Sequence, residues 1–116
     1  MSRWFGRLLI SAIFFVSAVV STSAQQRFAL IVSGASGGSP YAERYDRWRG
    51  TLVSSLRSDL YFQEEDLFVL AEIPGPRVGR ASQEGVRQVT RTLARRLSDD
   101  ATLLVVLIGH GTFDGI

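Results

Sequence analysis

The stretch "RFALIVSGASGGSP", Arg27 to Pro40, joins an apolar run to a loop that carries three glycines in five positions. The run includes β-branched side chains and ends at glycine, which predicts a short buried strand over residues 27–33. A glycine-rich loop after a strand has two interpretations. It is either a cradle for the phosphates of a nucleotide or the first loop of a different active site.

Two later runs, "LFVLA" (67–71) and "ATLLVVLI" (101–108), are also short and continuously apolar, so we expect two more buried strands. Between the runs, apolar residues recur at steps of three or four, which predicts two helices. The first helix presents a stripe in which the aromatic residues are expected to be core: Tyr41, Tyr45, Trp48, Leu52, Leu56 and Leu60. The second follows Ser82, a plausible N-cap, with this stripe: Val86, Val89, Leu93 and Leu97.

The order strand, helix, strand, helix, strand, with continuously apolar strands, predicts an α/β fold with a parallel sheet. Helices are expected on both faces of the sheet, giving three layers. "EIPGPRVGR", residues 72–80, contains two prolines and two glycines and is expected to be a loop. Three strands and two helices make a thin domain, so we expect residues 25–116 to be a fragment of a larger one.

Residues 1–24 have the order of a secretory signal peptide. Arg3 and Arg7 form a basic start, residues 8–20 are apolar, and small residues follow at 22–24. The apolar segment is shorter than the roughly 20 residues that span a bilayer, which favours a cleaved signal over an uncleaved anchor. We therefore expect an exported protein that meets the membrane only during export, through this segment.

The remaining segment is formally neutral, because 11 arginines balance 11 acidic residues. It has no basic stripe with interleaved aromatic residues, so a nucleic-acid partner is not expected. The chain has no lysine, which a P-loop needs to reach nucleotide phosphates, and no cysteine. One histidine with scattered carboxylates falls short of a metal-ligand set, and no cofactor is expected.

A dinucleotide-binding loop would require a last glycine where the chain has Pro40, and an acidic residue about 20 positions further on. Glu72 ends the second predicted strand, but it lies much further from the loop than that. The pattern of a dinucleotide site is thus incomplete, and a nucleotide-binding oxidoreductase fragment is kept only as a minor alternative.

His110 is the only histidine and lies between two glycines at the end of the third predicted strand. It could simply cap the strand through a backbone hydrogen bond. However, reactive groups in parallel sheets gather at the carboxyl ends of strands, where an accessible imidazole can act as general acid or base. Residues alone leave these two interpretations equally open.

The segment "LLVVLIGHGTFDG", 103–115, resembles the strand and His-Gly motif of legumain-like and caspase-like cysteine peptidases. "FALIVSGASGG" is similar to their first strand and loop, and "EEDLFVLAE" to their second strand. "ASQEGVRQVTRTLARRL" is similar to the helix before the histidine strand. The resemblance covers nearly all of residues 27–115 and implies the strand order 2-1-3. It also implies that residues 25–116 are the amino-terminal half of a caspase-like peptidase domain.

The resemblance implies a peptide or protein substrate, with His110 as catalytic histidine and the Gly111 N–H in the oxyanion hole. In this superfamily the nucleophile is a cysteine at the end of the next strand. The chain has none, so it is expected to be truncated or to have lost activity. The positions at which legumains bind asparagine hold Pro40, Ala42 and Glu43, which leaves the substrate side chain open.

With the order 2-1-3, the glycine loop lies beside the histidine at one edge of the sheet. Several loop residues then become candidates for orienting His110 or lining the cleft, although turn formation is the more common role of serines in such a loop. They are Ser33, Ser36, Ser39, Gly37 and Gly38. A caspase-like module that binds a partner without catalysis is the second alternative.

Overall fold

The structure, a computed structural model, describes residues 24–111. The signal-peptide prediction therefore lies almost wholly outside the described residues. Neither helix within residues 24–111 is both long and apolar enough to cross a membrane.

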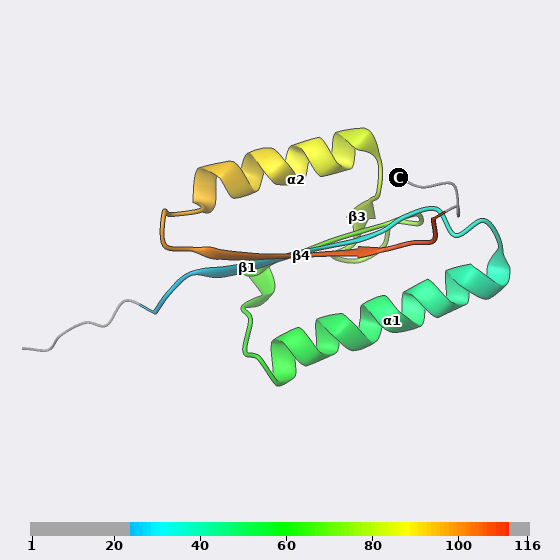
Figure 1. Cartoon of the computed structure of the whole chain (residues 1–116), viewed down its shortest axis with the longest axis horizontal. Helices are drawn as coiled ribbons and strands as arrows, with labels where there is room; N and C mark the ends of the chain where they lie inside the picture. The colour runs from blue at the N-terminus through cyan, green and yellow to red at the C-terminus, as the bar shows by residue number, and fades with distance from the viewer. Residues whose placement is uncertain (1–23, 112–116) are drawn as a thin grey trace, which may run out of the picture.

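A parallel sheet of four strands forms the centre of the molecule (Figure 1). The strands are β1 (Arg27–Ser33), β2 (Leu67–Ala71), β3 (Gly79–Arg80) and β4 (Thr102–Ile108), in the order β3-β2-β1-β4. The three long strands thus have the order 2-1-3 that the resemblance implied. The prediction that residues 72–80 are entirely loop is wrong, because β3 pairs with the end of β2. Two residues, one of them glycine, carry no alternating pattern by which such a strand could be recognised.

Helices cover opposite faces of the sheet, so the expected α/β architecture of three layers is confirmed (Figure 1). α1 (Ser39–Ser58) lies on one face and α2 (Gln83–Arg96) on the other. Alternate residues of β1 point to the two helices. Ala29 and Ile31 pack with Leu56 of α1, whereas Phe28 and Leu30 pack with Leu93 of α2.

The helix termini follow ordinary capping rules. Pro40 lies in the first turn of α1, where its missing N–H and fixed φ are tolerated. Ser82 is the N-cap of α2, as predicted, and its Oγ accepts a hydrogen bond of 3.1 Å from the Gly85 N–H. A short 3₁₀ helix, η1 (Glu64–Asp66), lies between α1 and β2.

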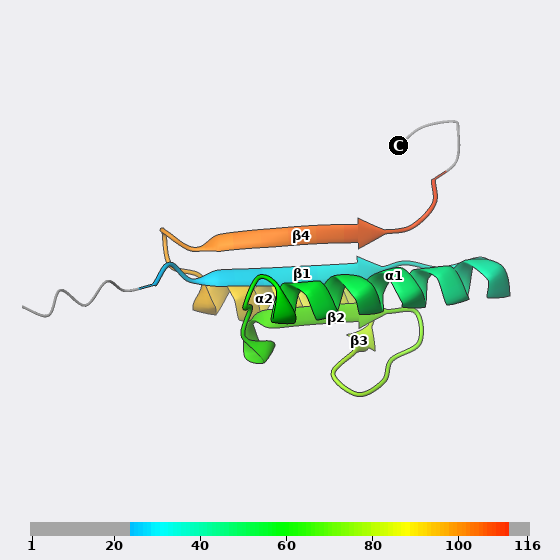
Figure 2. The same ribbon diagram turned by 90° about the horizontal axis from the view of Figure 1, so that it is seen from below.

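The aromatic stripe of α1 is core only in part. Tyr45 is 4% exposed, but Tyr41 and Trp48 are 47% and 51% exposed, so their assignment to the core is wrong. A helix of 20 residues is about 30 Å long, whereas a strand of seven residues spans about 23 Å. The first turns of α1 therefore extend past the carboxyl ends of the strands (Figures 1 and 2).

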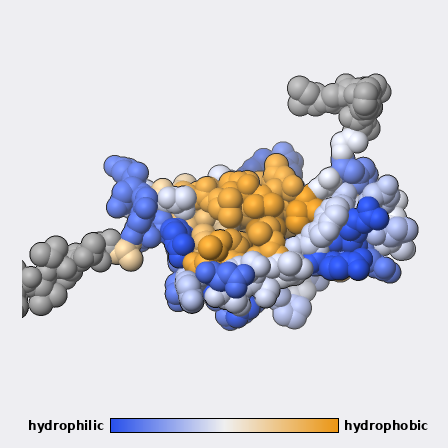
Figure 3. Space-filling model, turned by 60° about the horizontal axis from the view of Figure 1, so that its bottom comes forward, coloured by the Kyte–Doolittle hydropathy of each residue, from blue (hydrophilic) through white to orange (hydrophobic). Residues whose placement is uncertain are grey.

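β4 is the exception to the rule that helices cover both faces. Figure 2 shows α1 over β1 and β2, with β4 beside it and uncovered. Four apolar side chains of β4 are exposed: Leu103, Leu104, Val105 and Leu107. Because side chains alternate along a strand, Leu104 lies on the α1 side, with Val106 and Ile108, whereas Leu103, Val105 and Leu107 lie on the α2 side. A space-filling view shows a continuous apolar area on the α1 side (Figure 3). The expectation of a sheet covered on both faces is therefore wrong for β4, which lies at the edge with β1 as its one partner.

Candidate functional site

The carboxyl ends of β1 and β4 lie side by side, and their loops form the candidate site. The strands pair in register up to Ser33 and Ile108. The Gly34 N–H then donates a 2.9 Å hydrogen bond to the Ile108 carbonyl. This bond carries the pairing one residue further, so the glycine loop and the segment with His110 leave the sheet together.

His110 is held by a tyrosine of α1. The Tyr45 Oη and His110 Nδ1 are 2.6 Å apart, a short hydrogen bond whose donor depends on the imidazole tautomer. The ring of Tyr41 lies against the same imidazole, with centroids 5.2 Å apart. Tyr45 is buried, whereas His110 is exposed. A fixed side chain thus positions an imidazole that remains open to solvent.

Gly37 of the glycine loop lies beneath the imidazole. A Cβ at this position would be 3.6 Å from both His110 Cε1 and His110 Nε2. Its φ of +72° is also one that glycine adopts without strain. The loop therefore lies beside the ring edge that is not bonded to Tyr45, and the backbone conformation at residue 37 favours glycine.

The candidate serines make contacts elsewhere. Ser33 is buried, and its Oγ accepts from the Arg49 guanidinium at 3.1 Å while donating toward the Leu70 carbonyl at 3.4 Å. Ser36 donates to Glu72 Oε2 from both its N–H, at 3.1 Å, and its Oγ, at 2.9 Å. Ser39 is exposed at the first residue of α1. The serine contacts thus brace the loop against β2 and α1.

The two remaining candidate glycines flank the site. Gly38 precedes α1, and a Cβ there would meet Pro40 at 3.9 Å. Gly111 follows His110, is exposed, and has no atom within 4 Å of a Cβ built on it. Its backbone is therefore open to an approaching ligand.

Sequence reasoning missed the second role of Tyr45, because its place in an apolar helical stripe indicated only burial. A usable signal was present. The helix that follows the first strand begins beside that strand's carboxyl end, and the order 2-1-3 brings the third strand to the same place. The first turns of that helix were thus the nearest source of a partner for His110.

A small cavity adjoins the site behind Tyr45. It has a volume of about 30 Å³ and is lined by Ser33, Ser36, Tyr45, Arg49 and Glu72, among others. Arg49 is fixed there by a 2.8 Å ion pair with Asp46. The space admits a water molecule but no side chain, so it supports the loop and is too small for a substrate pocket.

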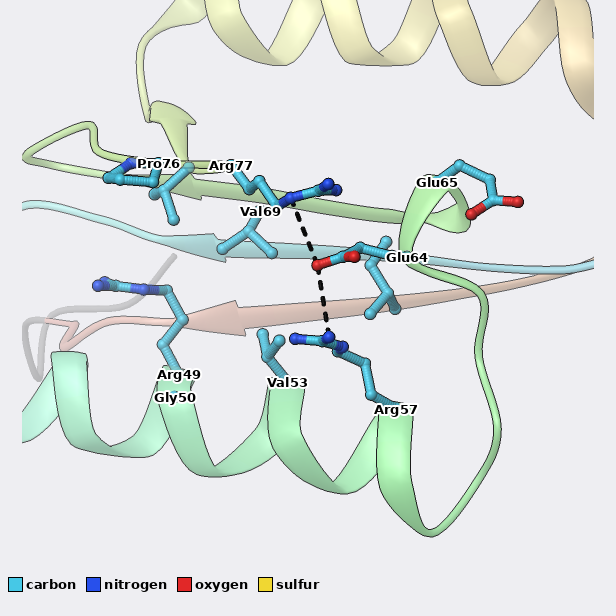
Figure 4. Close-up of a pocket in the computed structure, with 11 residues that line it drawn as sticks. Arg49, Gly50, Val53, Arg57, Glu64, Glu65, Val69, Pro76 and Arg77 are labelled. Atoms are coloured by element: carbon cyan, nitrogen blue, oxygen red, sulfur yellow. Dashed lines mark ion pairs between the residues drawn. The ribbon is translucent and has the colours of Figure 1, made fainter.

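A larger cavity is separate from His110 and was not predicted. It has a volume of about 530 Å³ and lies between α1, η1, β2 and the loop before β3. Arginine and glutamate side chains line it together with valines (Figure 4). Within residues 24–111, no group of three or more acidic or histidine side chains is placed to hold a metal ion.

The chemistry available at the site is that of a neutral or protonated imidazole. Nδ1 is engaged by Tyr45, and the opposite edge, with Nε2, faces the glycine loop. Such a group can transfer a proton to or from a ligand in the loop. No protein-family model, no curated protein and no solved structure matches the chain.

Proposed function

We propose that the chain is the histidine-bearing part of an exported cysteine endopeptidase of the caspase/legumain type. The observation that carries the proposal is the position of His110: at the carboxyl end of β4, fixed through Nδ1 by Tyr45 and lying over the glycine loop. General acid–base catalysis needs an imidazole that is both fixed and accessible. The resemblance of the His-Gly segment to these peptidases agrees with that role.

The proposed roles follow from the same geometry. His110 protonates the leaving amine of the scissile peptide bond. The Gly111 N–H donates to the oxyanion that forms on the carbonyl. The loop with Gly37 and Gly38 forms one wall of the cleft, and Ser33 and Ser36 brace that wall. Tyr45 positions the imidazole and contacts no substrate.

The nucleophile must come from elsewhere, because the chain contains no cysteine. The free edge of β4 suits a further parallel strand, and the carboxyl end of such a strand would lie next to His110. We place the cysteine there, on a polypeptide segment that pairs with β4. Its thiolate attacks the carbonyl carbon, the amine leaves with a proton from His110, and water hydrolyses the acyl-enzyme.

A peptidyl acyloxymethyl ketone, which alkylates activated cysteines, tests the proposal in the native source of the protein. We expect labelling of the polypeptide that carries His110, or of a partner bound to it. The label should be lost in His110→Ala and kept in Arg87→Gln, an exposed control on α2. Complete absence of labelling, or labelling that survives His110→Ala, contradicts the proposal.

The second candidate is a caspase-like module that binds a partner without catalysis. Its support is the exposed apolar edge of β4, which offers unpaired backbone groups and apolar side chains. The two functions differ in one measurable respect. The peptidase turns over a peptide substrate and loses that turnover with His110→Ala, although it retains the partner. A binding module has no turnover to lose and captures a β-strand partner equally well with His110→Ala.

A further inference from the structure

The cavity of about 530 Å³ between α1 and β2 combines an apolar floor with a charged rim. Val53, Leu67, Val69 and Val78 form the floor and belong to the core cluster on the α1 side of the sheet. Arg57 and Arg77 reach over it from α1 and from the loop before β3 (Figure 4). A volume of about 530 Å³ falls within the range of small-molecule sites, which are mostly apolar with a few polar groups that fix orientation.

The two rim arginines share one carboxylate. Glu64 Oε1 lies 3.5 Å from an Arg57 nitrogen and 3.4 Å from Arg77 Nε. Both distances exceed the 2.7–2.9 Å usual for charge-assisted hydrogen bonds. Neither guanidinium makes a hydrogen bond within the part of the chain that the structure describes. Glu65 points away from the pair (Figure 4), so two cations here face one anion.

The backbone of Arg77 supplies an independent indication. Gly75 and Val78 exchange two hydrogen bonds of 2.9 and 3.0 Å around a tight turn. Pro76 occupies the second turn position and Arg77 the third, with φ of 58°. This is the pattern of a type II turn, whose third position normally takes glycine. A long cationic side chain is thus held in a conformation that disfavours it, which is typical of functional positions.

We propose that this cavity binds an organic carboxylate with an aliphatic body. The carboxylate lies between Arg57 and Arg77 and displaces the weakly held Glu64, because a guanidinium can bind a carboxylate through two parallel hydrogen bonds. The aliphatic part covers Val53, Val69 and Val78. A free aliphatic acid and the carboxyl end of an apolar peptide share this chemistry. The site is remote from His110 and independent of the proposed peptidase function.

Hexanoate is the first probe, titrated into the full chain while backbone amide resonances are followed by NMR. We expect saturable shifts at Val69 and Val78, with Kd on the order of 1 mM for so small a ligand. 1-Hexanol, the neutral analogue, should bind at least about tenfold more weakly. Ala-Val-Leu with a free or an amidated carboxyl end then distinguishes a peptide terminus from a free acid.

Arg77→Gly is the decisive variant, because it removes the guanidinium while placing the preferred residue in the turn. We expect a melting temperature equal to or above that of the parent chain, together with at least about tenfold weaker hexanoate binding. A merely structural Arg77 would give the opposite: unchanged binding and a lower melting temperature. Glu64→Gln removes the internal competitor and should tighten binding by up to about fivefold, the value of an exposed ion pair.

Arg57→Gln has a matched control in Arg87→Gln. Each arginine side chain is 51% exposed and lies 3.5–3.6 Å from one glutamate. Arg57→Gln should weaken hexanoate binding at least about fivefold and Arg87→Gln should leave it unchanged. The proposal is overturned if hexanoate produces no shifts at about 10 mM, if hexanol binds as well, or if Arg77→Gly and Arg57→Gln both bind like the parent chain.

Discussion

The ring of Tyr45 is buried in the core, and its hydroxyl hydrogen-bonds to His110 in the candidate site. The side chain is 4% exposed, so the ring is fixed by packing and the Oη has little freedom. His110 itself is exposed and, within the described residues, hydrogen bonds to Tyr45 through Nδ1. The orientation of the imidazole is therefore set from the helix side, by a residue that no ligand needs to touch.

Tyr45→Phe should change the state of the imidazole more than the stability of the fold. Water can replace the hydroxyl at an exposed Nδ1, so we expect a loss of about 1 kcal/mol or less in unfolding free energy. The ¹⁵N resonances of the His110 ring should shift toward a mixture of tautomers in alkaline solution. Tyr41→Phe is the control, since that ring packs against His110 at a tilt and its hydroxyl makes no hydrogen bond to the imidazole. Identical His110 spectra in both variants would contradict the assigned role of Tyr45.

At single positions the sequence predicted location better than contacts. The place of the lone histidine at a strand end followed from the apolar run before it, whereas its reactive role stays a prediction. Its partner could not be identified, because tyrosine is compatible with both core and site. The serines were candidates by type, and only coordinates show that Ser36 bonds to Glu72 and Ser33 to Arg49.

Among the elements, α2 depends on a local cap. Ser82 Oγ accepts a hydrogen bond from the Gly85 N–H. Glu84 lies in the first turn, where its negative charge interacts favourably with the positive end of the helix dipole. α2 also carries Leu93, the helix residue buried in the core on its side of the sheet. Loss of the cap at Ser82 is therefore expected to weaken the same helix that packs Leu93 into the core.

Ser82→Ala should lower the unfolding free energy by about 1 kcal/mol, because the Gly85 N–H loses its acceptor. Urea denaturation measures this as a lower midpoint with an unchanged slope. Ser54→Ala is the control, at an exposed position within α1, and should stay within about 0.5 kcal/mol of the parent chain. Equal midpoints for Ser82→Ala and the parent chain would show that the cap contributes nothing.

Element type and order were predictable because the three long strands are continuously apolar and the helices have a clear period. β1 and β2 have the predicted bounds, and β4 begins one residue later than expected. β3 was missed because its pairing depends on the turn at Pro76 and Arg77, and on a glycine at 79. A Cβ at that position would lie 2.8 Å from Leu70 Cδ2, so the absence of a side chain is what lets β3 approach β2.

For the whole molecule, we expect the uncovered strand β4 to promote self-association in solution. It has an unpaired edge, seven residues without charge or proline, and exposed apolar side chains on both faces. Natural edge strands are normally protected by charges, prolines or bulges. The apolar pattern of 101–108 is the same for a covered and an uncovered strand, which is why the sequence could not predict this exposure.

Leu107→Lys should reduce self-association of the isolated chain. Leu107 is 76% exposed, so a lysine there costs little packing and places a charge beside the free edge. Sedimentation velocity over a concentration series should show less material above the monomer mass than in the parent chain. Ile73→Lys, at a loop residue 78% exposed, adds the same charge away from β4 and should not change the distribution. Equal effects of the two lysines would assign the change to net charge alone.

The central position of β1 also has a kinetic consequence. Arg27 pairs with Thr102, about 75 positions later in the chain, and Ala29 with Leu67, about 38 positions later. At synthesis rates of about 5–20 residues per second, β1 leaves the ribosome about 4–15 s before its last partner exists. A newly made chain therefore carries an apolar, unpaired strand for seconds, long enough for holding chaperones to act before the sheet can close.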